Sequence, residues 1–191
     1  MKFKEKVKKF WKFLNEDSWE STFVSLILFL IIIYFVIFPL ASLLTGTKYF
    51  LVIVESCSMH HRYPLEEIIN NKYYKERGIS KENITSWPFK NGFNKGDIIF
   101  SVGPSNLKVG DVIIFNPQKE EYKYPIIHRI IEIDDTIVTK GDNNNGILEV
   151  EKNISRDKIL AKSLFRIPYL GWIKLIFFDW RNPPEKRGFC K

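Results

Sequence analysis

The chain has 191 residues, of which 45% are hydrophobic, and a formal net charge of +7. This length suits one domain with an appendage and is sufficient to bury a hydrophobic core. The charge does not indicate a nucleic-acid partner, because the first lysines cluster just before an apolar segment and no other basic block is interleaved with aromatic residues.

The first 20 residues are polar and rich in lysine, with apolar residues at helical spacing. These apolar residues are Phe3, Val7, Phe10, Trp11 and Leu14. The spacing predicts an amphipathic helix that lies along a membrane surface, so residues 1–20 form a separate segment. Lysines on this side of an apolar segment place it in the cytoplasm by the positive-inside rule.

Residues 21–47 contain no charged side chain and are dense in Leu, Ile, Val and Phe. As a helix, the apolar run 22–44 is about 35 Å long, enough to cross a hydrocarbon core of about 30 Å. A cleavable signal peptide is the alternative, but its apolar region is usually only about 7–15 residues long. We therefore expect a retained transmembrane anchor, with residues 48–191 on the extracytoplasmic side.

Beyond the anchor, short β-branched runs are separated by Gly-Asp, Asn-Pro and Asp-Asp breaks. This pattern predicts an antiparallel β-sheet. The expected strands are residues 50–55, 97–102, 111–115, 126–133, 136–139 and 159–165.

Residues 60–92 interrupt this pattern between the first two strands. Leu65, Ile68, Ile69 and Tyr73 have helical spacing, which predicts one inserted helix followed by a loop. The expected fold is therefore mainly β: an antiparallel β-sheet domain with one inserted helix, preceded by an N-terminal transmembrane helix.

Three further features concern the later part of the chain. The aromatic-rich residues 167–178 are too short to span a bilayer and suit either the core or the membrane interface, and we expect the core. Asn83 and Asn153 match the N-glycosylation pattern, which is compatible with an extracytoplasmic domain. Cys57 and Cys190 form no disulfide framework or metal pair by spacing, so we expect one buried and one free thiol, although pairing is open.

Ser58 is a candidate nucleophile in the turn after the first strand, although most Ser-x-Ser sequences are ordinary turns. His128, on the strand 126–133, is a candidate general base, because the unperturbed pKa of histidine is about 6.5. Asp142 follows the next strand, where a carboxylate could accept a hydrogen bond from the second nitrogen of the histidine. Taken singly, a strand histidine is more often structural and an Asp-Asn turn is ordinary.

Taken in order, these motifs resemble the type I signal peptidases of the archaeal and endoplasmic-reticulum branch. The motifs are Ser-Met, two Gly-Asp strand starts, Ile-His-Arg, Lys-Gly-Asp-Asn-Asn and Ile-Pro-x-Leu-Gly, and the resemblance runs from the anchor to about Ile173. It implies a membrane-anchored serine protease with Ser58 as nucleophile, His128 as base and Asp142 as its orienting acid. It also implies that the Ser56 hydroxyl and the Ser58 N–H form an oxyanion hole.

The same resemblance implies cleavage of signal peptides from secreted and membrane preproteins after small residues. The implied partners are these preproteins, membrane lipid, and translocation machinery or other signal peptidase subunits. The membrane is the plasma membrane or, in a eukaryote, the endoplasmic reticulum. No cofactor and no metal ion are implied.

The chain departs from the family pattern near the nucleophile and after Asp142. Cys57 replaces the usual glycine, and His60-His61 replace Glu-Pro. A second acidic residue usually follows the Gly-Asp-Asn motif, and here Glu149 is the nearest candidate, in the sequence Leu148-Glu149-Val150-Glu151.

Three alternatives remain open at this stage. Cys57 is a second candidate nucleophile. The residues Cys57, His60, His61 and His128 are suitable ligand types for zinc. An inactive relative that serves as a membrane-anchored binding subunit is the third alternative.

Overall fold

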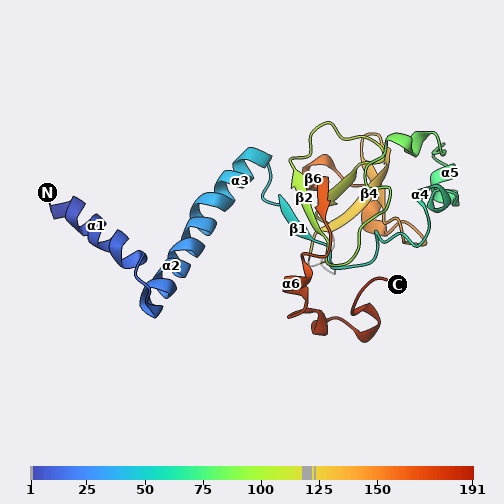
Figure 1. Cartoon of the computed structure of the whole chain (residues 1–191). Coiled ribbons are helices and arrows are strands. Elements are labelled where there is room, and N and C mark those ends of the chain that lie inside the picture. Colours follow the sequence, from blue (N-terminus) through green and yellow to red (C-terminus); the bar gives the residue numbers. More distant parts are fainter. Residues whose placement is uncertain (1, 118–121, 123) are drawn as a thin grey trace. The chain divides into compact units, whose positions relative to one another are not determined.

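The computed structural model describes residues 2–117, 122 and 124–191. The chain forms two compact units, Met1–Leu44 and Thr45–Lys191. The first unit is helical, with α1 (Lys2–Leu14), α2 (Trp19–Ile32), the π-helix η1 (Ile33–Ile37) and α3 (Phe38–Thr45) (Figure 1).

The helix after α1 is long and apolar enough to cross a membrane. It runs over 27 residues, Trp19–Thr45, and begins at Ser18, whose side chain accepts a hydrogen bond from the Ser21 backbone N–H. The π-helical turn lies just before Pro39, which has no N–H to donate to the preceding turn. The amphipathic segment expected in residues 1–20 is helical over Lys2–Leu14, and its place on a membrane stays a prediction.

The second unit contains one six-stranded antiparallel sheet. Its strands are β1 (Leu51–Ile53), β2 (Ile98–Val102), β3 (Val112–Phe115), β4 (Ile126–Ile133), β5 (Ile137–Lys140) and β6 (Ile159–Ile167). Their order in the sheet is β1-β2-β6-β3-β4-β5. All six expected runs form strands, but "mainly β" holds only in part, because 37% of the residues are helical and 19% lie in strands.

Two strands are buried along their whole length. One is the apolar β3, inside the sheet, and the other is β5, at the end of the sheet order, where even Lys140 is buried. One core cluster joins β3, β4 and β5 with the segment before β6 and contains Ile113, Phe115, Ile130, Ile137, Ile154 and Ile159. A second cluster packs Met59, directly after Ser58, against Val54, Phe93, Ile99 and Val112. The turn that carries Ser58 is therefore anchored in the core by Met59.

The insertion forms two one-turn helices rather than the single helix that the sequence predicts. These are α4 (Leu65–Ile68) and α5 (Lys72–Lys75), followed by the 3-10 turn η2 (Asn83–Ser86). The break occurs because the Asn71 side chain accepts a hydrogen bond from the Tyr73 N–H and so starts a new helix. The insertion buries its apolar residues, including Leu65 and Tyr74, against Ile131 of β4 and Val138 of β5.

The segment after β6 is mostly exposed, which corrects the expectation that it belongs to the core. It contains α6 (Trp172–Leu175), η5 (Asp179–Arg181) and η6 (Pro184–Lys186) (Figure 1). Leu175 is buried, and Lys95 forms a buried ion pair with Asp179.

Cys57 and Cys190 form a disulfide with a Cα–Cα separation of 5.6 Å. The expectation of a buried thiol and a free thiol is therefore wrong. The bond joins the residue before Ser58 to the end of the segment that follows β6.

Candidate active site

Ser58 and His128 lie within hydrogen-bonding distance, although 70 residues separate them. The His128 Nε2 atom is 2.9 Å from the Ser58 Oγ atom. Ser58 lies in the turn after β1, and His128 lies on β4 opposite Ile113 of β3. Strands β2, β6 and β3 lie between β1 and β4 in the sheet, so the sheet curves to bring both residues to one site.

The second nitrogen of His128 contacts Glu151 and not Asp142. His128 Nδ1 lies 2.5 Å from Glu151 Oε1, and both side chains are almost completely buried. The Thr139 hydroxyl donates to the same carboxylate oxygen at 3.1 Å. The Leu148 backbone N–H donates to the other oxygen at 2.8 Å. Glu151, and not Asp142, is therefore the carboxylate in contact with His128, and the expected contact between Asp142 and the histidine is wrong.

Glu151 is held by the short 3-10 turn η3 (Glu149–Glu151). Its side chain reaches back to the backbone N–H of Leu148, as in a capping box. Glu149, the nearest acidic candidate by sequence, is exposed and forms an ion pair with Lys152. The only sequence signal for Glu151 is its place three residues after Leu148, where the turn starts. This signal is weak, because the sequence alone does not show that a turn starts there.

Asp142 is the centre of a second buried network, with Arg129 and His61. The Arg129 Nε and Nη2 atoms donate to its carboxylate at 3.0 and 2.8 Å. The other Arg129 N–H groups donate to the backbone carbonyls of Pro88, Phe89 and Gly110, so the guanidinium is fully bonded. Burial alone raises the pKa of the Asp142 carboxyl, but the charge of Arg129 and the bond from His61 outweigh it and hold that pKa well below its usual range.

His61 bonds through both of its ring nitrogens. Its Nε2 lies 2.7 Å from Asp142 Oδ2, and its Nδ1 lies 2.8 Å from the Lys90 carbonyl oxygen. Both partners are hydrogen-bond acceptors, one a carboxylate and the other a backbone carbonyl. His61 therefore links the base of the insertion to Asp142.

His60 closes the same base of the insertion. Its Nδ1 lies 2.7 Å from Asn94 Oδ1, and its backbone forms an antiparallel bridge with Gly92. Gly92 has φ of +60°, and a Cβ there would lie 2.1 Å from the Met59 carbonyl oxygen. His60 and His61 thus hold the start of the insertion against its end, at residues 90–94, directly after the turn that carries Ser58.

The turn that carries Ser58 has two attachments beyond Met59. The backbone N–H of Asn143 donates to the Ser58 carbonyl at 2.8 Å, and its side-chain amide donates to the Cys57 carbonyl at 3.0 Å. The disulfide to Cys190 is the second attachment. Because Asp142 immediately precedes Asn143, its ion pair with Arg129 positions this loop against the turn that carries Ser58.

Ser56 lies beside Ser58, with its Oγ 3.1 Å from Ser58 Oγ. The Ser56 side chain is exposed, whereas Ser58 is half-buried. When Ser58 donates to His128, Ser56 is left as the donor to Ser58. The two hydroxyls and the imidazole then form one directed chain of hydrogen bonds.

Lys140 contributes a buried positive charge near the two carboxylates. Its Nζ donates to the carbonyls of Gly141 and Asn144 at 2.9 and 2.6 Å. Burial lowers the pKa of the Lys140 ammonium, while Asp142 and Glu151 oppose that change. These bonds hold Lys140 to its own turn, so it interacts with Asp142 and Glu151 through its positive charge.

Ser58 and His128 open into a cleft of about 720 Å³. One side is formed by β1 with Val52 and Ile53, and the other by Ile126 and Ile127 at the start of β4. β1 is at one end of the sheet order and pairs with β2 on one side, so its other edge is available to an extended peptide. Lys174 of α6 lies at the polar end of the cleft, where it pairs with Glu55 at 3.4 Å.

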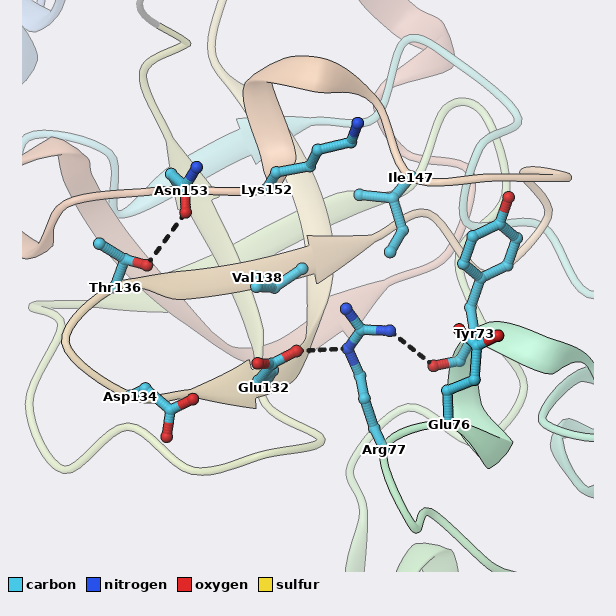
Figure 2. Close-up of a pocket in the computed structure, with 10 residues that line it drawn as sticks. All are labelled: Tyr73, Glu76, Arg77, Glu132, Asp134, Thr136, Val138, Ile147, Lys152 and Asn153. Atoms are coloured by element: carbon cyan, nitrogen blue, oxygen red, sulfur yellow. Dashed lines mark hydrogen bonds and ion pairs between the residues drawn. The ribbon is translucent and has the colours of Figure 1, made fainter.

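A second hollow, of about 470 Å³, lies between the insertion and the β4–β5 hairpin (Figure 2). Arg77 spans it, with its Nε 2.5 Å from a carboxylate oxygen of Glu132 and its Nη1 bonded to the Tyr73 carbonyl. Asn153, one of the two potential glycosylation sites, lies at its rim and accepts a hydrogen bond from Thr136. None of the residues that line it belongs to the Ser58 site.

A scan against protein-family models gives no match, and a search of proteins with curated functions gives none either.

The structure argues against two of the alternatives, Cys57 as nucleophile and a zinc site. Cys57 is in a disulfide, so it has no thiol for nucleophilic attack or for zinc. His61 and His128 have separate carboxylate partners. Within residues 2–117, 122 and 124–191, no group of three or more His, Cys, Asp or Glu side chains is placed to hold a metal ion.

Proposed function

We propose that this protein is a membrane-anchored serine endopeptidase of the signal peptidase I type, which cleaves signal peptides from preproteins after small residues. The observation that carries the proposal is the hydrogen-bonded chain from Ser58 through His128 to Glu151. A nucleophile, a base and an orienting acid in this geometry suit acyl transfer. The ordered motifs that resemble the signal peptidases add the substrate class.

In the acylation step, His128 Nε2 removes the proton from Ser58 as its Oγ attacks the scissile carbonyl carbon. Glu151 holds Nδ1–H on the far side of the ring, which leaves Nε2 free to accept the proton and stabilises the imidazolium. His128 then protonates the leaving amine, and the peptide bond breaks. Water, activated by the same histidine, hydrolyses the acyl-enzyme and regenerates Ser58.

The Ser58 backbone N–H and the Ser56 hydroxyl are proposed to stabilise the oxyanion. Ser56 is free to turn from Ser58 Oγ to the developing charge, because the two hydroxyls are 3.1 Å apart and Ser56 is exposed. Loss of one such donor typically costs about 100- to 1000-fold in rate.

The substrate is proposed to bind as an extended strand along β1, with its small side chains between Val52 and Ile127. The free edge of β1 supplies backbone partners, and the apolar lining of the cleft excludes charged side chains. The anchor holds the site close to the membrane from which the preprotein emerges. The proposed orientation is N-terminus in the cytoplasm and catalytic domain outside, in the plasma membrane or the endoplasmic reticulum.

The test is cleavage of a secreted preprotein by the purified full chain in detergent or lipid discs. We expect mass spectrometry to find a single cut after a small residue, and a bulky residue introduced at that position to block it. Ser58→Ala should abolish the product, while the matched variant Ser105→Ala, an exposed loop serine, should not. A Ser58→Ala enzyme that cleaves normally would refute the mechanism, and a wild-type chain that cleaves no preprotein would favour the binding subunit.

A further inference from the structure

The side chain of Asn144 borders the same small space as the Nε2 atom of His128. A Cβ atom placed on Gly141 would lie 2.7 Å from Asn144 Nδ2 and 2.8 Å from His128 Nε2. Both distances are shorter than a carbon atom tolerates, so a larger residue at position 141 would displace the ring or the amide. Glycine therefore allows both side chains to approach the backbone of this turn.

The backbone of Asn144 is fixed in the turn, whereas its side-chain amide is not. Its N–H donates to the Gly141 carbonyl at 2.9 Å, and its carbonyl accepts from the buried Lys140 ammonium at 2.6 Å. In the part of the chain that the structure describes, the Asn144 amide forms no hydrogen bond. Asn144 is half-buried and lines the cleft that contains Ser58. The turn thus presents an amide that is able to bond to a molecule in the cleft.

This position becomes important once Ser58 carries an acyl group. In the free protein, His128 Nε2 lies 2.9 Å from Ser58 Oγ. An esterified Oγ has no hydrogen to donate, so Nε2 can accept one from water instead. A water bonded to Nε2 is within reach of the Asn144 amide, because both groups border one space. Ser56 contacts Ser58 Oγ, so Ser56 borders the proposed nucleophile and Asn144 borders the base.

We propose that Asn144 is a further catalytic residue, which holds the water that hydrolyses the acyl-enzyme. The inference rests on the proposed peptidase function, since it requires an acyl group on Ser58. The water donates one hydrogen to His128 Nε2 and the other to the Asn144 amide oxygen, which leaves a lone pair for attack on the ester carbon. The amide is able to turn its oxygen to the water, because no hydrogen bond to the described residues fixes its orientation.

The hydrolysis step balances without any further reactant. The water oxygen bonds to the ester carbon, and the water proton passes to His128. The bond from that carbon to Ser58 Oγ then breaks, and His128 returns the proton to Oγ. The products are the free Ser58 hydroxyl and the carboxylic acid of the cleaved peptide. Asn144 contributes orientation alone, and misplacement of a reacting group can cost about 100-fold in rate.

The test is hydrolysis of an activated ester, acetyl-alanine p-nitrophenyl ester, by the full chain in detergent. Nitrophenolate leaves readily, so acylation is fast and the steady rate reports deacylation. Asn144→Ala should release about one nitrophenol per protein in a burst and then turn over about 100-fold more slowly than the wild type. The matched control is Asn145→Ala, an exposed neighbour outside the cleft lining, which should behave as the wild type.

Hydroxylamine provides a second measurement that a general structural defect would not produce. It is a stronger nucleophile than water and attacks the ester without a positioned base, which gives the hydroxamate and free Ser58. Added hydroxylamine should therefore restore turnover of Asn144→Ala and change the Asn145→Ala rate little.

The possible results separate this inference from the proposed function. Asn144→Ala that hydrolyses the ester at the wild-type rate would overturn the role of Asn144 and leave the peptidase proposal intact. Loss of the burst in this variant would also overturn it, because Asn144 would then be needed for acylation. A wild-type chain that forms no acyl group on Ser58 would contradict the proposed function and this inference together.

Discussion

Exchange of Glu151 for glutamine removes one negative charge from the site while it preserves the shape of the side chain. Glu151 Oε1 accepts from His128 and Thr139, and Oε2 accepts from the Leu148 N–H. An amide has one accepting and one donating end. If its oxygen faces His128, its NH₂ group meets the Leu148 N–H. If its NH₂ group faces His128, the ring must accept at Nδ1 and carry its proton on Nε2, where it cannot take the Ser58 proton.

The expected loss is therefore large in kcat. When the orienting acid of a serine protease is replaced by its amide, the histidine takes the wrong tautomer and kcat falls by about 10,000-fold. We expect a fall of roughly 100- to 10,000-fold for Glu151→Gln, or about 3–5 kcal/mol in the barrier at about 1.36 kcal/mol per tenfold. KM should change little, because Glu151 is fully buried and lies outside the cleft lining.

The assay is the kcat of preprotein cleavage by full-length enzyme, with the melting temperature recorded for each variant. Glu149→Gln is the matched control. Glu149 is exposed and lies two residues before Glu151, so its exchange removes the same charge outside the site, and this variant should cleave at the wild-type rate. A Glu151→Gln variant that is folded and cleaves as fast as Glu149→Gln would refute the assignment of Glu151 as the orienting acid.

Three more outcomes follow from the contacts around the nucleophile turn. Asp142→Asn should lower the free energy of unfolding by about 3–5 kcal/mol in urea titrations, because Arg129 keeps its buried charge without a counter-ion. The pKa of Asp142 is depressed on folding, so its contribution is complete above about pH 5 and is lost as pH falls below about 4; the variant should lack this acid-dependent loss. Cys190→Ser should cost about 2–4 kcal/mol of stability and lower kcat, and reduction of the wild type with dithiothreitol should do the same. Asn143→Ala loses the bond to the Cys57 carbonyl but keeps the backbone bond to Ser58, so kcat should fall only about five-fold; an unchanged kcat would show that the Asn143 side chain does not help to hold the turn.

The strands were predictable because each is a short apolar run between strong turn signals. The predicted run 126–133 coincides with β4, and the other five runs agree with their strands within two residues at each end. The inserted helix was predicted as one because Leu65, Ile68, Ile69 and Tyr73 keep a helical period. The period continues across Asn71, but its side chain caps the backbone there, and such local bonds compete with helix propagation.

The candidate site was predictable as far as the approach of Ser58 and His128 and not beyond. His128 lies in the middle of a strand, and Ser58 lies in the turn that follows another, so their places in the fold could be predicted from the sequence. The choice between Asp142, Glu149 and Glu151 depends on how the loop from 141 to 151 folds, and that depends on contacts with Arg129 and the Leu148 backbone. The disulfide was missed for the same reason, since its two residues are 133 positions apart and spacing carries no information about their approach.

The link between Cys57 and Cys190 has a consequence for the order of events in synthesis. Residue 57 leaves the ribosome 133 residues before its partner. Until residue 190 follows and both thiols are oxidised, the turn that carries Ser58 is held by non-covalent contacts, among them those of Asn143 and Met59. Disulfides persist on the oxidising side of a membrane and are rare in the cytosol. A nascent or still untranslocated chain therefore carries its serine in a looser turn than the finished protein.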